Sequence, residues 1–164
     1  MPAARALRVA VCGLGTAGAA AATLLARSGR CSVHVWERGA ESGAAAGAGR
    51  MGAGIELQPV GLRVLEQMGL LEAVVAHGAR LDSLLARTAE GRTVLDLRYA
   101  CFDRRLFGVG LLREVLHREL AGAVMGENSV AVRYGESVAG ACVAETASAN
   151  AADRVFCAPI GAAP

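Results

Sequence analysis

The first forty residues combine two apolar runs with one segment of helical composition. Leu7–Cys12 is a short apolar run that ends at a glycine, as a buried strand does. Residues 17–28 are rich in helix formers and stop before Gly29, which suits the end of a helix. A second apolar run follows over residues 32–36. The pattern predicts strand, glycine turn, helix and strand, with the two strands parallel because such crossovers are right-handed.

Further helical and strand patterns follow a loop over residues 39–54 that is mostly glycine, alanine and serine. The proline at position 59 suits the first turn of a helix, and Gly91 suits the turn of a hairpin. The predicted elements are helices over 59–68, 70–76 and 113–124, hairpin strands over 84–88 and 93–97, and strands over 130–134 and 138–143. The fold class is therefore α/β, a Rossmann-like domain with a parallel sheet and a β-hairpin insertion.

Composition narrows the class of function. Hydrophobic residues make up 54% of the 164 residues and charged residues 20%, which supplies a buried core. A net charge of +2 and an aromatic content of 4% argue against a nucleic-acid partner. The chain contains arginine but no lysine, so a lysine Schiff base and the usual lysine-containing P-loop are excluded.

The spacing of cysteine and histidine argues against metal and disulfide frameworks. The five cysteines are scattered without a C-x-x-C pair, and the three histidines lie far apart, so we expect no metal site. Scattered thiols suit a reducing compartment and predict a cytoplasmic protein. The uncharged stretch over residues 9–26 contains three glycines and many alanines, which makes it a poor membrane segment or signal peptide. We therefore expect no membrane partner.

The segment that points to chemistry is a G-x-G-x-x-G between the first predicted strand and helix. Its six residues are Gly13, Leu14, Gly15, Thr16, Ala17 and Gly18. The first glycine allows a sharp turn off the strand, the second lets a pyrophosphate approach the backbone, and the third lets the helix pack on the sheet. Free amides and the helix dipole would hold the phosphates. The segment predicts a dinucleotide site.

Glu37 strengthens this interpretation. It follows Gly18 by nineteen residues, near the spacing of about twenty at which a carboxylate accepts hydrogen bonds from ribose hydroxyls. Its charge would repel a ribose 2′-phosphate, which favours FAD or NAD over NADP as the first dinucleotide. The alternative interpretation is a structural βαβ unit with an incidental glutamate.

Longer segments carry a resemblance to a known family. They are VAVCGLGTAG (9–18), VWER (35–38), GAGIELQP (52–59), GLRVLEQMGLL (61–71) and LLREVLHREL (111–120). Together they resemble the FAD-dependent aromatic hydroxylases, the single-component flavoprotein monooxygenases related to para-hydroxybenzoate hydroxylase and salicylate hydroxylase. The resemblance covers residues 7–143.

The resemblance implies FAD as the cofactor and NAD(P)H as a transient co-substrate that reduces the flavin. It also implies a small aromatic substrate, which receives one oxygen atom from O₂. The glycines of the motif would wrap the FAD pyrophosphate, Glu37 would bind the adenosine ribose, and Arg38 would lie beside the adenine. Arg50 matches an arginine that reaches the flavin, although the family has one more residue before the next glycine. Arg113 matches a cofactor-contacting arginine, and no catalytic residue is identified.

The chain departs from the family towards its end. The family continues with an Asp-Gly strand-turn and a later Gly-Asp motif, but ADRVFCAPI (152–160) lacks both glycines and the second aspartate of the first motif. We therefore expect residues 1–144 to form a partial FAD-binding domain of the monooxygenase type, and residues 145–164 an irregular tail with a degenerate Asp-Gly region. On this interpretation the chain is truncated, with an uncovered sheet edge that favours association with another chain.

Two other functions stay open from the sequence. One is a non-catalytic remnant that binds a nucleotide or acts as an interaction module. The other is a small NAD-dependent dehydrogenase. The long glycine-rich loop after Glu37 argues against the dehydrogenase, because that fold proceeds promptly to its next helix and strand.

Overall fold

The structure, a computed structural model, describes residues 6–40, 53–140, 142–144 and 155–157. The chain divides into two units. The first consists of Met1–Ala46 and Ala121–Pro164, and the second of Gly47–Leu120. The glycine motif and Glu37 lie in the first unit, and the hairpin lies in the second.

A three-stranded parallel sheet forms the centre of the first unit. Its order is β1 (Leu7–Cys12), β2 (Cys31–Glu37) and β8 (Val130–Tyr134), so β2 lies in the middle. The register places Cys12 beside Trp36 across the sheet. The structure confirms these three predicted strands and the parallel pairing of the first two. The carboxyl ends of β1 and β2 therefore meet at one edge of the sheet, next to the glycine motif.

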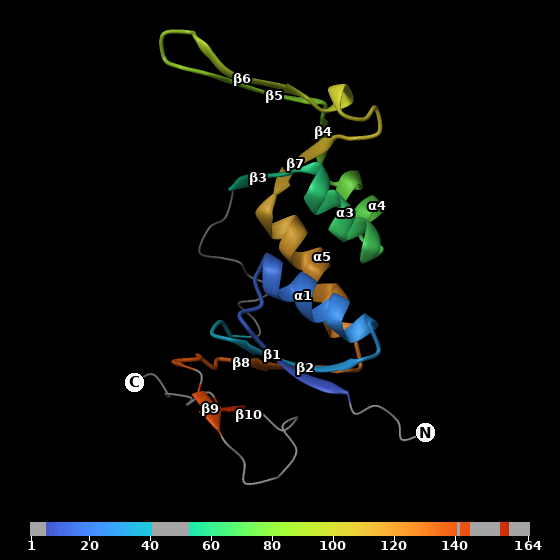
Figure 1. Ribbon diagram of the computed structural model, residues 1–164, viewed down its shortest axis with the longest axis vertical. Helices are drawn as coiled ribbons and strands as arrows, with labels where there is room; N and C mark the ends of the chain where they lie inside the picture. Colours follow the sequence, from blue (N-terminus) through green and yellow to red (C-terminus); the bar gives the residue numbers. More distant parts are fainter. Residues whose placement is uncertain (1–5, 41–52, 141, 145–154, 158–164) are drawn as a thin grey trace. The chain divides into compact units, whose positions relative to one another are not determined.

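Helix α1 (Thr16–Arg27) packs against one face of this sheet (Figure 1). Ala19 and Ala22 are buried on the helix, and Val33 and Val35 are fully buried on β2. Small side chains on the helix let its backbone come close to the strand. The helix ends within one residue of its predicted end.

Strand β1 is more exposed than its apolar sequence predicts. Leu7 keeps 64% of its surface exposed, and Ala10 and Cys12 are exposed as well. The prediction of a buried strand is wrong because the sheet order leaves β1 at an edge. Among the described strands, β1 forms a ladder with β2 alone.

The second unit is built around an antiparallel sheet. Its strands, in spatial order, are β3 (Gly54–Leu57), β7 (Gly108–Leu112) and β4 (Ala79–Leu81). Helices α3 (Pro59–Gln67) and α4 (Leu71–Ala76) pack against each other, close to their predicted bounds. The core side chains of this unit are Leu62, Leu65, Met68, Val74, Tyr99, Val109, Leu111, Leu116 and Leu120. None of the three strands was predicted, because they are short and rest on pairing between distant segments.

The hairpin of β5 (Ser83–Arg87) and β6 (Thr93–Arg98) is a two-stranded antiparallel ribbon (Figure 1). Gly91 adopts a φ of +85° in its turn, as the sequence predicts. A short 3-10 turn, η1 (Tyr99–Cys101), follows the hairpin. Helix α5 (Arg113–Met125) begins directly after β7 and confirms another predicted element.

The segment after β8 differs from its prediction. The sequence predicts a strand over 138–143, whereas the structure has β9 (Cys142–Ala144) and only an isolated bridge at Val138. The intervening alanines and glycine favour strands weakly. β9 pairs antiparallel with β10 (Val155–Cys157), a short strand inside the segment expected to be irregular. The division of the chain at residue 144 stays a prediction.

Candidate functional site

Three glycines shape the turn between β1 and α1, each under a different constraint. Gly13 has a φ of +93°, and its N–H donates to the carbonyl of Trp36 at 2.7 Å. A Cβ at Gly18 would overlap the carbonyl oxygen of Gly13, so only glycine allows the helix to approach the turn. A Cβ at Gly15 would meet no described atom within 4 Å. The turn therefore combines close internal packing with open space beside Gly15.

The first turn of α1 keeps its backbone amides available. Gly15 is the N-cap residue, and in the described structure no side chain caps the helix. The first turn also contains no acidic residue. Thr16 and Ala17 are exposed. No side chain of the helix's own first turn thus compensates the positive end of its dipole, and such helix starts bind phosphate groups.

Glu37 ends β2, and its carboxylate reaches back to the glycine turn. Oε2 accepts a hydrogen bond from the N–H of Leu14 at 2.6 Å, and Oε1 accepts one from the N–H of Gly39 at 2.7 Å. Leu14 is 1% exposed as a whole residue, so its N–H serves to hold the carboxylate of Glu37 in place. The carboxylate is therefore held against the turn, and its contact with a ribose stays a prediction.

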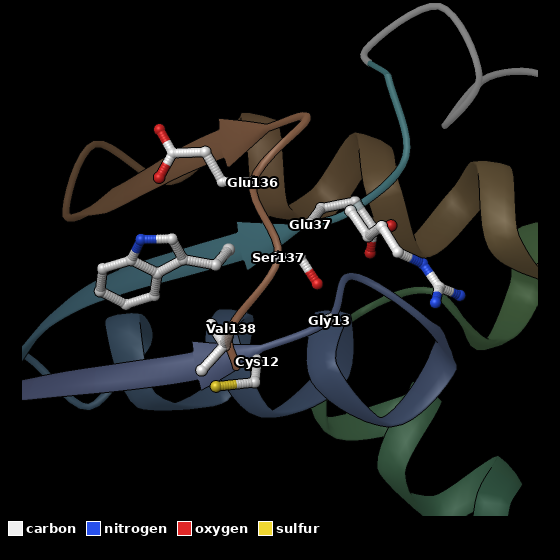
Figure 2. Close-up of a pocket in the computed structure, with 8 residues that line it drawn as sticks. Cys12, Gly13, Glu37, Glu136, Ser137 and Val138 are labelled. Atoms are coloured by element: carbon white, nitrogen blue, oxygen red, sulfur yellow. The ribbon is translucent and has the colours of Figure 1, made fainter. Parts of the chain in front are cut away.

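A cleft of about 250 Å³ opens at the carboxyl ends of the parallel strands (Figure 2). It is lined by Cys12, Gly13, Trp36, Glu37, Arg38, Glu136, Ser137 and Val138. Open parallel sheets bind their ligands beyond this edge. The volume lies just below the range of roughly 300–1,000 Å³ typical of ligand pockets, so it suits part of a dinucleotide better than the whole.

The structure brings together most of the residues that the sequence singled out. The six residues of the glycine motif, Glu37 and Arg38 lie in the first unit, and exposed Arg38 lines the cleft. Arg50 lies outside the described residues. Arg113 is exposed at the first position of α5 in the second unit, where its N–H donates to the carbonyl of Ala53 at 3.1 Å. The cofactor contacts assigned to these residues stay predictions.

Sequence reasoning missed five residues of the cleft. They are Cys12, Trp36, Glu136, Ser137 and Val138. The last three follow β8, whose pairing with β2 brings them to the edge where Glu37 lies. The N–H of Gly135 donates to the carbonyl of Gly39 at 3.0 Å, and the N–H of Glu136 donates to the carbonyl of Glu37 at 3.2 Å. The order of the strands in the sheet would have predicted the residues after β8, because the carboxyl ends of neighbouring parallel strands share one edge.

The part of the chain that the structure describes gives no support for a metal site or for a membrane-spanning helix. No group of three or more histidine, cysteine or acidic residues there could hold a metal ion. Nor does that part contain a helix with the length and apolar character needed to cross a bilayer. The thiols of Cys12, Cys31 and Cys101 are free.

Comparison with known proteins relates the chain to one class of enzyme by sequence. No family model matches the chain. A 91-residue segment is 37% identical to 3-amino-4-hydroxybenzoate 2-monooxygenase of Streptomyces cremeus. That segment is 55% of this chain and 21% of that protein.

Solved structures of flavin-dependent monooxygenases match the fold of this chain. PqsL of Pseudomonas aeruginosa, described as a probable FAD-dependent monooxygenase, matches with a TM-score of 0.67 and 26% identity over 86% of this chain and 36% of its own. The flavin-dependent monooxygenase PieE, solved with FAD and substrate, matches in fold with a TM-score of 0.61 and 20% identity. That match covers 87% of this chain and 26% of PieE. The chain is thus similar in sequence and fold to FAD-dependent monooxygenases over a part of their length, which confirms the predicted resemblance and the α/β fold class.

Proposed function

We propose that the chain is the FAD-binding part of an NAD(P)H-dependent flavoprotein monooxygenase that hydroxylates a small aromatic substrate. One observation carries the proposal. The uncapped start of α1, the open space at Gly15 and the carboxylate of Glu37 lie at the same turn. The likeness to an aminohydroxybenzoate monooxygenase supports the aromatic class of substrate.

The residues at this turn fit the adenosine diphosphate part of FAD. The N–H groups of the first turn of α1 would hold the diphosphate, and the space beside Gly15 would admit it. The carboxylate of Glu37 would accept hydrogen bonds from the ribose hydroxyls. FAD bound there would supply the redox chemistry, namely reduction by NAD(P)H and reaction with O₂. Arg50 and Arg113 are assigned to the flavin side by the family resemblance.

Gly15→Asp tests this proposal, because stability and binding should change in opposite directions. Aspartate is a favoured N-cap residue, so its carboxylate should keep or slightly raise the stability of the free chain. The same carboxylate would occupy the phosphate position with a repelling charge. We expect FAD affinity, measured by flavin fluorescence and calorimetry, to fall roughly tenfold or more.

Gly122→Asp is the matched control, because a Cβ at Gly122 on α5 would also meet no described atom within 4 Å. It adds the same charge on a different helix and should leave FAD affinity unchanged. Equal affinity in the original chain and Gly15→Asp would overturn the diphosphate site. Binding of NADH in preference to FAD would favour the dehydrogenase instead.

The cytoplasm is the location that we infer for this activity. The free thiols of Cys12, Cys31 and Cys101 support a reducing compartment. Fractionation of cells that express the tagged chain would test this location, and recovery outside the cytoplasm would contradict it.

A further inference from the structure

Two buried polar atoms of the cleft lack a hydrogen-bond partner among the described residues. They are Nε1 of Trp36 and Oε2 of Glu136. Both residues line the cleft at the carboxyl edge of the sheet. Buried polar atoms are nearly always paired, with protein, water or a ligand, so each of these atoms needs an explanation.

The two atoms have opposite hydrogen-bonding character. An indole N–H only donates, and a carboxylate oxygen only accepts. The other oxygen of Glu136, Oε1, lies 3.7 Å from Nη1 of Arg133. One oxygen of the carboxylate therefore faces a cation, and the other has no hydrogen-bond partner among the described residues. A single group that paired with both atoms would present an acceptor and a donor side by side, as the edge of a nucleobase does.

The charges in the cleft indicate which part of a dinucleotide would lie there. Glu37 and Glu136 both line it, and Arg38 is its cationic lining residue. Two carboxylates repel phosphates but accept hydrogen bonds from neutral donors such as hydroxyl and amino groups. The diphosphate is therefore favoured at the start of α1, and the sugar and base are favoured in the cleft beyond Glu37.

We propose that Trp36 and Glu136 recognise the adenine base by one of its edges. Oε2 of Glu136 accepts a hydrogen bond from the exocyclic amino group, and Nε1 of Trp36 donates one to N7, the neighbouring ring nitrogen, which is an acceptor in both adenine and hypoxanthine. The pair thereby sets base specificity at the proposed FAD site, on which this inference rests. Hypoxanthine, which has a carbonyl in place of the amino group, would set an acceptor against the carboxylate.

Calorimetry of the whole chain with ADP and with inosine diphosphate tests the pair directly. We expect ADP to bind at least about tenfold more tightly. Glu136→Gln should reduce this ratio towards one and improve binding of inosine diphosphate, because the glutamine amide can donate to the hypoxanthine carbonyl. Glu72→Gln, an exposed residue of α4, is the control and should keep the ratio of the original chain.

A second readout follows from the single tryptophan of the chain. Fluorescence of Trp36 should change on titration with ADP and stay constant with inorganic pyrophosphate, which has no base. Thermal melting of Glu136→Gln checks that the variant is folded.

The outcomes separate this inference from the proposed function. Equal affinity for ADP and inosine diphosphate, with FAD still bound, would overturn base recognition and leave the diphosphate site standing. A ratio unchanged by Glu136→Gln would remove Glu136 from the site. Failure of the original chain to bind FAD, ADP and inosine diphosphate would defeat both proposals.

Discussion

The carboxylate of Glu37 and the backbone N–H of Leu14 form a hydrogen bond of 2.6 Å that joins the end of β2 to the turn between β1 and α1. The N–H of Gly39 donates to the other carboxylate oxygen at 2.7 Å. Two backbone partners fix the carboxylate before a ligand arrives. A carboxylate oxygen can accept more than one hydrogen bond, so these bonds to the backbone are compatible with the predicted contact to a ribose hydroxyl. One side chain would thereby serve both the turn and the proposed cofactor.

Glu37→Gln should weaken both roles. A glutamine amide sets a donor against one of the two backbone N–H groups, so we expect the free energy of unfolding to fall by about 1–3 kcal/mol. FAD affinity should fall roughly tenfold, the effect of one lost hydrogen bond to a charged group. Urea denaturation and flavin fluorescence measure the two effects. Glu90→Gln, in the exposed hairpin turn, should leave FAD affinity unchanged. Unchanged FAD affinity in a destabilised Glu37→Gln would restrict Glu37 to the structural role.

Gly18→Ala should destabilise the chain because helix and turn touch at this position. A Cβ there would overlap the carbonyl oxygen of Gly13, a backbone atom that cannot move aside without shifting the turn. We expect the free energy of unfolding to fall by about 1–3 kcal/mol, the usual cost of overpacking. Gly122→Ala, in open space on α5, should instead raise it by about 0.5–1 kcal/mol. Urea denaturation of both variants gives the comparison, and equal changes would contradict the close approach.

Tyr99 should make stability fall at alkaline pH. Its hydroxyl lies 2.7 Å from Oε1 of Gln58 and 3.1 Å from Oε1 of Glu56, and its residue is 3% exposed. Burial, and then the hydrogen bond and charge of Glu56, raise the pKa of Tyr99 above its ordinary value of 10.0. Because the pKa of Tyr99 is higher in the folded chain than in the unfolded chain, protonated Tyr99 stabilises the fold. This stabilisation is complete below pH 10 and is lost as pH rises through the pKa of the folded chain.

Denaturation across the alkaline range checks this sign. The free energy of unfolding should fall more steeply above pH 10 in the original chain than in Tyr99→Phe. Tyr134→Phe, at the other tyrosine of the chain, is the control and should keep the steep fall. Identical slopes for Tyr99→Phe and the original chain would contradict the assignment.

Local signals explain how much of the fold was predictable. Helices α1, α3, α4 and α5 and the hairpin β5–β6 carry their own periodicity or their own proline and glycine signals at ends and turns, and all were predicted. Strands β3 and β7 were not, because Gly54 pairs with Leu112 across a long separation and both strands contain glycine. Their partners, rather than their own sequence, make them strands. Association through the edge at β1 stays a prediction, and light scattering would test it.

The part of the site that lies within one βαβ unit of the sequence could be predicted. The spacing from Gly13 to Glu37 follows from one βαβ unit, so these residues could be named from the sequence. The bond from Leu14 N–H to Glu37 depends on how the turn closes, and the arrival of Glu136 depends on β8 lying beside β2. Neither relationship can be predicted from a local pattern in the sequence.

Cys12 offers a direct measure of cleft occupancy. Its thiol is free and exposed at the end of β1, and the residue lines the cleft. Cys101 is also free and exposed but belongs to the second unit, so it is an internal control for the reagent, and buried Cys31 is the slow reference. We expect FAD and ADP to slow alkylation of Cys12 in proportion to the liganded fraction and to leave Cys101 unchanged. Peptide mass spectrometry resolves each site. Equal slowing at both cysteines would indicate global stabilisation, and no slowing at saturating ADP would mean that the base lies elsewhere.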